Sequence, residues 1–245
     1  MALMDKVEIP RRTMVLFFIV DTSGSMEGSK IGAVNIAIRE VIPEIRDLSE
    51  ENADALIKIA VLEFSSGAKW LTSGGPVESE KFNWTNLDAA GVTDFGAACK
   101  TLNEKLSTKA FMAEATGSFA PVIFLLSDGE PTDDWQKGLD ELKKNNWFKT
   151  AIKVAVAIGD DANKDVLKEF TGTSEAVIEV HTTAMLMKMI KFVSVRASQV
   201  ASKSSNAVDP SQDTGDGAKQ DEFIQELQEI KEEIAAAPDN NDPEW

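Results

Sequence analysis

Four short apolar runs, rich in β-branched and aromatic residues, are the strongest constraint on how this chain folds. They cover residues 13–20, 55–64, 121–126 and 151–158. Continuous runs of this kind are typical of strands that are buried on both faces of a sheet. Helical patterns lie between them, most clearly at residues 31–48 and 95–106, and Leu139 and Leu142 mark a third. Strands that alternate with helices predict an α/β fold: a doubly wound, mostly parallel sheet with helices on both faces.

A shorter strand at residues 176–180 and a final helix complete the predicted domain. The helix carries its apolar residues on one face, at Leu186, Met189, Ile190, Val193, Ala197 and Val200. We take residues 1–12 as a lead-in and residues 13–205 as the domain. The helix also begins with Met185 and Met187, and methionines could form a soft-metal site. Methionine beside a core helix more often fills gaps in the packing, and we favour that interpretation.

The residues after this domain differ in composition. From Asn206 onward the chain has twelve acidic and two basic residues, so most of its net charge of −16 lies here. Residues 206–220 are rich in Asp, Ser, Gly and Gln, which predicts a flexible acidic linker. Residues 221–237 are predicted to be an amphipathic helix, because apolar residues recur there at helical spacing: Phe223, Leu227, Ile230 and Ile234. A tail follows at 238–245. Whether the helix packs on its own domain or on a partner stays open.

Charge and rare residue types exclude several functions. With 41 acidic and 25 basic residues, the surface repels nucleic acids and anionic membranes, so we expect neither as a partner. A single cysteine, Cys99, allows no internal disulfide, and a single histidine, His181, leaves no Cys/His zinc site. The apolar stretch near the start is short, ends at Asp21 and lacks a signal-peptide cleavage site. These observations predict a soluble cytoplasmic protein.

Two of the predicted strands end in an aspartate that is followed by turn residues. The first leads into DTSGSM, which contains Asp21, Ser23 and Ser25, and the strand at 121–126 leads into SDGEPTD, which contains Asp128. Ligands of doubly wound sheets bind beyond the carboxyl ends of the strands. Carboxylates and hydroxyls suit a hard divalent cation such as Mg²⁺. A third segment, GVTDFG, places Thr93 at a helix start, where it could also serve as a cap.

These three segments resemble the metal-ion-dependent adhesion site of von Willebrand factor type A domains. Asp21, Ser23, Ser25, Thr93 and Asp128 match its five positions in order, and the resemblance extends over about residues 15–204. It implies a Mg²⁺ site, with Mn²⁺ or Ca²⁺ as alternatives, in which the hydroxyls contact the metal and the two aspartates hold it, partly through water. It also implies a protein without enzymatic activity, whose metal accepts a Glu or Asp from a protein partner.

The segment FLLSDGEPTDDW and the cytosolic character resemble, more narrowly, the bacterial TerY-like branch of this family, which is associated with tellurium resistance and chemical stress. Relatives in that branch accompany a Ser/Thr kinase and a PP2C-type phosphatase, so the resemblance implies such partners. The residues from Asn206 onward lie outside the family pattern and inherit nothing from it.

A phosphatase of the haloacid dehalogenase type is the alternative. Its first motif also places an aspartate after a buried strand, which would make Asp21 the nucleophile, and Asp160 with Asp165 resembles its last motif. Those enzymes use a second aspartate, two residues after the nucleophile, as general acid. Here that position is Ser23, which cannot protonate a leaving group near neutral pH. The alternative also leaves Thr93 unexplained.

Several other residues are interpreted as structural. The segment GSMEGSK misses the spacing of a phosphate-binding loop, so Lys30 is expected to be a solvated helix residue. His181 is expected to be a surface or capping histidine and not a catalytic base, and Cys99 is expected to be a small buried residue. Asp133 and Asp134 are expected in the solvated first turn of a helix, where acidic side chains are favourable.

Overall fold

The computed structural model describes residues 11–113, 117–160, 162–202 and 218–236. Most of the predicted lead-in, the predicted linker up to residue 217 and the predicted tail at 238–245 lie outside the described residues. The side chains of Ala197, Val200 and Ile234 lie outside them as well. Within the described part, seven strands form one sheet in the order β3-β2-β1-β5-β6-β7, and β4 pairs with β2.

The parallel strands of this sheet follow the apolar runs of the sequence. They are β1 (Arg12–Asp21), β2 (Ala55–Ser65), β5 (Val122–Ser127), β6 (Ile152–Ile158) and β7 (Val177–Val180). β1 lies between β2 and β5 and pairs with both in parallel. The α/β fold with a mostly parallel sheet, which the sequence predicts, is therefore confirmed.

Two short antiparallel strands go beyond the predicted sheet. β3 (Gly67–Trp70) folds back on the end of β2, and β4 (Val77–Glu78) pairs nearer its start. Strands this short carry too few residues to show a period in the sequence. They add an antiparallel edge to an otherwise parallel sheet.

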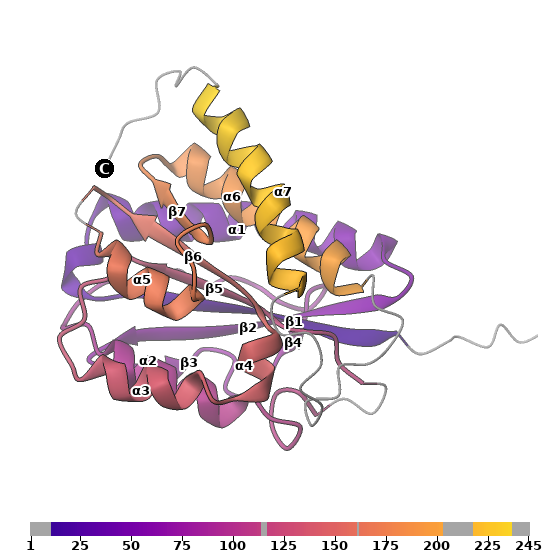
Figure 1. Ribbon diagram of the computed structural model, residues 1–245, viewed down its shortest axis with the longest axis horizontal. Helices are drawn as coiled ribbons and strands as arrows, with labels where there is room; N and C mark the ends of the chain where they lie inside the picture. The colour runs from indigo at the N-terminus through magenta and orange to yellow at the C-terminus, as the bar shows by residue number, and fades with distance from the viewer. Residues whose placement is uncertain (1–10, 114–116, 161, 203–217, 237–245) are drawn as a thin grey trace, which may run out of the picture.

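Helices cover both faces of the sheet (Figure 1). On one face lie α1 (Ser29–Glu51), α6 (Thr183–Ser202) and α7 (Ala218–Ala236). On the other lie α2 (Phe95–Lys105), α3 (Trp135–Leu142), α4 (Asn146–Thr150) and α5 (Lys164–Thr171). The apolar core is accordingly divided by the sheet into two clusters.

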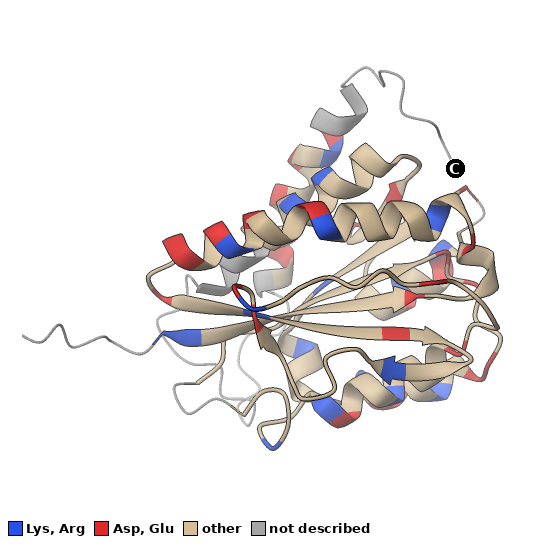
Figure 2. Cartoon of the chain, turned by 180° about the vertical axis from the view of Figure 1, so that it is seen from behind, with Lys and Arg blue, Asp and Glu red and all other residues tan. Residues whose placement is uncertain are grey.

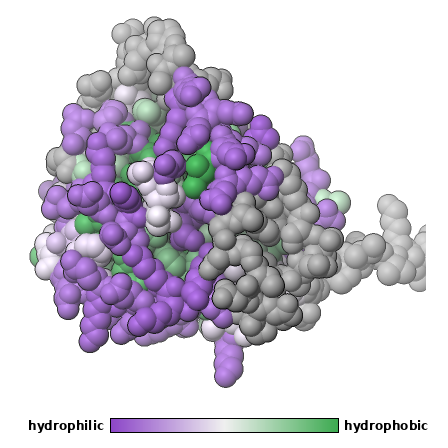
Figure 3. All heavy atoms as spheres, viewed as in Figure 1, coloured by the Kyte–Doolittle hydropathy of each residue, from purple (hydrophilic) through white to green (hydrophobic). Residues whose placement is uncertain are grey.

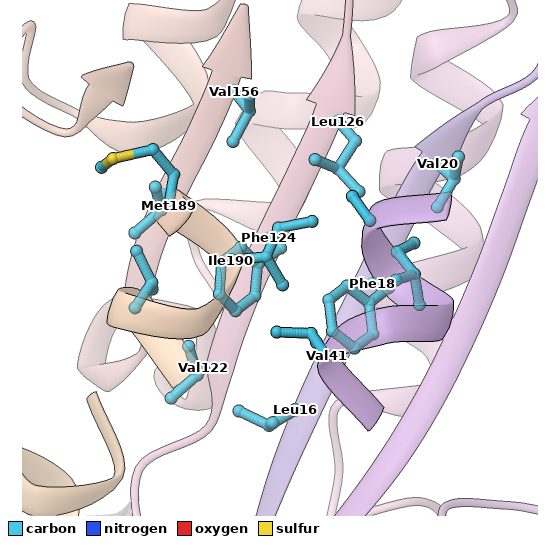
Figure 4. Close-up of a cluster of buried hydrophobic side chains, with 14 of the residues drawn as sticks. Leu16, Phe18, Val20, Val41, Val122, Phe124, Leu126, Val156, Met189 and Ile190 are labelled. Atoms are coloured by element: carbon cyan, nitrogen blue, oxygen red, sulfur yellow. The ribbon is translucent and has the colours of Figure 1, made fainter. Parts of the chain in front are cut away.

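Successive residues of β1 alternate between these two clusters. Phe18 belongs to the cluster beneath α1 and α6, whereas Phe17 belongs to the cluster on the opposite face. The rings of Phe18 and Phe124 stack with their centroids 5.3 Å apart, close to Val41 of α1 and Ile190 of α6 (Figure 4). Because both faces are buried, the strands show continuous apolar runs rather than alternation.

The last helix, α7, packs on its own domain, beside α6 (Figure 1). Phe223 and Leu227 are fully buried in the same cluster as Phe18, and the ring of Phe223 lies 6.3 Å from that of Phe192. The helix begins at Ala218, within the predicted linker. Of the two interpretations left open by the sequence, the structure supports packing within the chain.

α7 also covers the open edge of β6. β7 pairs with β6 only from Ala155 onward, so no strand among the described residues pairs with the start of β6 on that side. There the N–H of Lys153 donates to Oε1 of Gln220 (2.9 Å), and Nε2 of Gln220 donates to the carbonyl of Lys153 (3.0 Å). A side-chain amide therefore satisfies backbone groups that an edge strand would otherwise leave unpaired.

Charged residues gather on the outer faces of the helices and in the loops, and the strands carry few of them (Figure 2). No helix in the described part of the chain combines the length and the apolar composition that spanning a bilayer would require.

Candidate metal centre

Asp21 is the last residue of β1 and is buried at the carboxyl end of the sheet. Both of its carboxylate oxygens accept hydrogen bonds: Oδ1 from the N–H of Ser23 (2.9 Å) and Oδ2 from the hydroxyl of Ser127 (2.6 Å). Ser127 ends the neighbouring strand β5, and its hydroxyl accepts the N–H of Gly129 (2.7 Å). Two adjacent strand ends therefore fix the position of this carboxylate.

Ser23 and Ser25 follow Asp21 in the turn, and their hydroxyl oxygens lie 3.0 Å apart. Ser23 is buried, whereas Ser25 is exposed. A short 3₁₀ helix, η1 (Gly24–Met26), begins after Ser23 and buries Met26 in the core. The buried methionine anchors the turn, so the two hydroxyls lie together next to the buried carboxylate.

Asp128 follows β5 and is the second buried carboxylate at this edge, with 1% of its surface exposed. Its Oδ1 has no hydrogen-bond partner among the described residues, and its Oδ2 lies 3.5 Å from the ammonium of Lys30. The side chain of Lys30 is only 13% exposed, so the expectation of a solvated lysine is wrong. The physical reason is that a buried carboxylate requires a compensating positive charge.

Thr93 is buried on a loop that backbone hydrogen bonds tie to both aspartate segments. The N–H of Gly24 donates to the carbonyl of Gly91 (3.0 Å), which joins this loop to the turn after β1. The N–H of Thr93 donates to the hydroxyl of Thr132 (3.0 Å), and the N–H of Thr132 donates back to the carbonyl of Thr93 (2.9 Å). The structure thus brings the three predicted segments together at one end of the sheet.

Asp133 does not lie in a solvated helix turn, as expected, but caps a different helix. Its carboxylate accepts the N–H groups of Gly96 (3.0 Å) and Ala97 (3.1 Å) in the first turn of α2. Asp134 is exposed at the N-cap position of α3. An acidic side chain can accept hydrogen bonds from the free N–H groups at the start of any helix nearby. For Asp133 that helix is α2, although α3 follows it directly in the sequence.

Burial also governs the protonation of Asp21. Removal from water, with a smaller contribution from the charge of Asp128, raises the pKa of Asp21 to about 6, although hydrogen bonds from Ser127 and Ser23 act in the opposite direction. Ionisation of the buried Asp21 carboxylate is therefore unfavourable unless a positive charge lies beside it. This is the electrostatic setting in which a bound cation is favourable.

The donor atoms fit a hard divalent cation. They are carboxylate and hydroxyl oxygens, and Oδ1 of Asp128 is buried without a partner. Oxygen donors suit Mg²⁺, Mn²⁺ and Ca²⁺ better than softer metals. In the described part of the chain, no three His, Cys, Asp or Glu side chains cluster as metal ligands, so any metal here depends on the hydroxyls.

Three further residues contact the site without having been predicted there: Ser127, Thr132 and Lys30. Ser127 and Thr132 lie in the same segment as Asp128, so hydroxyls at both ends of that segment are the signal that could have identified them. Lys30 offers no such signal, because its ion pair with Asp128 joins residues that are 98 positions apart.

Cys99, His181 and the methionines of α6 lie in surroundings that suit structural roles. Cys99 is buried on α2, and burial raises the pKa of its thiol. His181 is partly exposed, and its Nδ1 lies 2.8 Å from Oδ1 of Asp160. Met189 is buried in the core with Met185 and Met187 packed against it, in agreement with the packing interpretation.

Comparison with known proteins matches this chain to one family model. The family model described as von Willebrand factor type A domain matches residues 16–191. A search of curated proteins finds no match. Solved structures with this fold include proximal thread matrix protein 1 from the mussel byssus (17% identity, TM-score 0.55, covering 75% of this chain and 47% of that chain). A second crystal structure of that protein has zinc in its metal-ion-dependent adhesion site (16% identity, TM-score 0.55, covering 75% of this chain and 47% of that chain).

A von Willebrand factor type A protein from Catenulispora acidiphila is equally similar (17% identity, TM-score 0.54, covering 76% of this chain and 42% of that chain). The chain thus spans less than half the length of these proteins, and at such identities the likeness concerns the fold. The family match covers most of the domain, including the second half of β1, all of β5 and the loops after both strands. The chain belongs to the von Willebrand factor type A domain family.

Proposed function

We propose that this chain is a metal-dependent protein-interaction module that holds Mg²⁺ through Asp21, Ser23, Ser25, Thr93 and Asp128. The observation that carries the proposal is the buried Oδ1 of Asp128, which no described residue satisfies. Leaving such an atom unpaired costs about 1–3 kcal/mol, and more for a charged group. A divalent cation held by these oxygen atoms would remove that cost. When bound, the cation would supply a Lewis-acidic position for a carboxylate oxygen of the partner.

The face around this site is open to a partner protein. Ser25 is exposed, and Val92, next to Thr93, is 47% exposed although it is a large apolar residue. An exposed apolar side chain beside a charged site gives a partner both a contact to bury and a charge to recognise. We therefore propose that the partner presents a Glu or Asp beside an apolar residue.

Enzymatic activity is not part of the proposal. Both oxygens of Asp21 accept hydrogen bonds that fix the carboxylate in place, which a metal ligand also requires, so these contacts do not single out a nucleophile. Ser23 occupies the position of the general acid that a phosphatase of the haloacid dehalogenase type would need. Asp160, the residue that resembles the last motif of such enzymes, has a side chain that is 90% exposed and pairs with His181.

The finer assignment follows the sequence resemblance. We propose a cytoplasmic protein of the TerY-like branch, acting in a response to tellurite or chemical stress, with a Ser/Thr kinase and a PP2C-type phosphatase as partners. The segment around Asp128 and the single cysteine support it. Co-purification of the chain with and without EDTA, followed by identification of the bound proteins, tests this assignment.

Isothermal titration of Mg²⁺, Mn²⁺, Ca²⁺ and Zn²⁺ into the EDTA-treated chain tests the site itself. We expect one equivalent of Mg²⁺ to bind the unaltered chain. The affinity for Mg²⁺ should fall about tenfold or more in Asp128→Asn, and likewise in the double variant Ser23→Ala/Ser25→Ala, because both remove metal ligands. Glu130→Gln is the matched control, since Glu130 is an exposed acid two residues beyond Asp128. Equal binding by all variants would refute the site, and phosphoester hydrolysis that Asp21→Ala abolishes would restore the phosphatase alternative.

A further inference from the structure

A groove of about 460 Å³ lies between α4, α5, the start of β6 and the first turns of α7. Phe148 and Phe170 form its aromatic lining, with ring centroids 5.3 Å apart and an edge-to-face arrangement, and Ile224 of α7 adds an aliphatic wall. Figure 3 shows apolar and near-neutral residues on this face among hydrophilic ones. Its size is typical of a ligand site, for which volumes of about 300–1,000 Å³ are common.

Lysines surround this groove, which is unusual in a chain of net charge −16. Lys143, Lys149 and Lys153 line it together with one acidic residue, Asp221. Residues 142–159 contain four lysines and no acidic residue. The ammonium of Lys153 donates hydrogen bonds to the carbonyls of Phe148 (3.1 Å) and Ala151 (3.0 Å). These contacts hold the positive charge of Lys153 beside the groove.

Lys149 is the lysine best placed to meet a ligand. Lys143 pairs with Glu169 at 2.7 Å, whereas Lys149 is exposed and no described residue accepts a hydrogen bond from its ammonium. The groove therefore combines an apolar lining with three positive charges, one of them available, against the single carboxylate of Asp221. A peptide that carries carboxylates and one large apolar side chain complements it.

The groove and the candidate metal centre lie at opposite ends of the sheet. Lys153 is the second residue of β6, at the amino end of the parallel strands, whereas Asp21 ends β1 at the carboxyl end. A ligand in the groove therefore does not compete with a ligand at the metal.

One segment of the chain itself has the required chemistry. Residues 237–245 contain Asp239, Asp242 and Glu244, no basic residue, and the aromatic Trp245. We infer that this segment of one copy of the chain binds in the lysine-lined groove of a second copy. Its carboxylates face Lys149 and its neighbours, and the indole packs against Ile224 and the aromatic lining.

Chain length favours a second copy over the same molecule. α7 ends at Ala236, and Ile224 lies about 18 Å back along the helix at 1.5 Å per residue. To return, the segment must first reverse direction, which uses about four of its nine residues. The remaining residues span at most about 16 Å, short of the groove. Exchange of segments between two copies gives a closed, symmetric dimer.

Fluorescence anisotropy of a labelled synthetic peptide, with the sequence of residues 237–245, tests the groove. The receptor is the full chain carrying Trp245→Ala, so that its own segment competes less. We expect saturable one-to-one binding that Lys149→Glu weakens about fivefold or more, since reversal replaces an attraction with a repulsion. The matched control is Lys144→Glu, an exposed lysine that does not line the groove, which should change binding less than twofold. A peptide with alanine in place of the tryptophan should also bind more weakly.

Sedimentation equilibrium of the unaltered chain, with and without EDTA, tests the second copy. We expect a concentration-dependent dimer that Trp245→Ala and Lys149→Glu each weaken, and that Lys144→Glu and EDTA leave unchanged. Absent peptide binding, or equal binding to the two lysine variants, would overturn the inference. A chain that stays monomeric above the peptide's dissociation constant would overturn the exchange between copies. A dimer that EDTA abolishes would assign the segment to the metal centre instead.

Discussion

The ammonium of Lys30 lies 3.5 Å from Oδ2 of Asp128, and both side chains are largely removed from water. The chain thus supplies a positive charge of its own to the end of the sheet where Asp21 is also buried. A divalent cation bound at Asp128 would share that carboxylate with Lys30, and two positive charges at such separations repel each other.

Replacing Lys30 with methionine should therefore strengthen metal binding. Methionine is similar in length and removes the charge, so we expect the affinity for Mg²⁺ to rise about three- to tenfold, or ~0.7–1.4 kcal/mol. Isothermal titration measures the change. Lys100→Met, at an exposed position of α2, is the control and should leave the affinity unaltered. Weaker binding by Lys30→Met would mean that Lys30 orients Asp128 for the metal instead of competing with it.

The metal-free chain should lose stability as the pH rises through the titration of Asp21. The pKa of Asp21 is about 6 in the folded chain, against 3.8 for an aspartate exposed to water, so the folded state binds this proton more tightly. The resulting stabilisation is complete below the unfolded pKa and is lost as the pH rises through about 6. Its upper limit is on the order of 3 kcal/mol.

Urea unfolding in EDTA at about pH 5 and about pH 7.5 measures this dependence. Other groups titrate in the same interval, so the comparison is between the unaltered chain and Asp21→Asn, which should lose part of the pH dependence. An equal change in the free energy of unfolding between the two pH values in both proteins would contradict the raised pKa of Asp21.

Two helical glycines should respond in opposite ways to alanine. A Cβ at Gly138 of α3 would lie 2.5 Å from the carbonyl oxygen of Gly96 in α2, whereas a Cβ at Gly32 of α1 would meet nothing within 4 Å. Alanine in an open helical position stabilises by about 0.5–1 kcal/mol. We expect that gain for Gly32→Ala and a loss of about 1–3 kcal/mol for Gly138→Ala, because the two helices must separate. Urea unfolding curves of both variants measure these changes in the free energy of unfolding. An equal gain in both would show that α3 can move away from α2 at little cost.

Gln220→Ala should destabilise the edge of β6. The variant leaves the N–H and the carbonyl of Lys153 without their present partners, so we expect a loss of about 1–2 kcal/mol in the free energy of unfolding. Hydrogen exchange at the amide of Lys153 should accelerate. Gln225→Ala, at an exposed position of the same helix, is the control. Unchanged exchange at Lys153 in Gln220→Ala would show that other groups protect this edge.

The parts of the structure that were predictable are those with a repeated local signal. β1 and β5 are buried on both faces, so they appear as apolar runs in the sequence. Asp21 and Asp128 are recognisable because each lies within two residues of the end of such a run. β3 and β4 are too short to show a period. The metal-binding role of the five residues stays a prediction.

Contacts between distant segments account for the rest. The pairing of Lys30 with Asp128 and the capping of α2 by Asp133 depend on which loops meet in space, and a single sequence contains no local pattern for either. The packing of α7 is intermediate: the spacing of Phe223 and Leu227 predicts a helix with an apolar face, but not the surface that covers it.

The pairing of Gln220 with Lys153 bears on where this protein can be cut. The family match ends at residue 191, before α7 begins, yet α7 contributes Phe223 to the core and shields the start of β6. A polypeptide trimmed to the family boundary would present bare backbone along that strand, which is a template for pairing between molecules. It would therefore be prone to aggregation even if its metal centre formed normally.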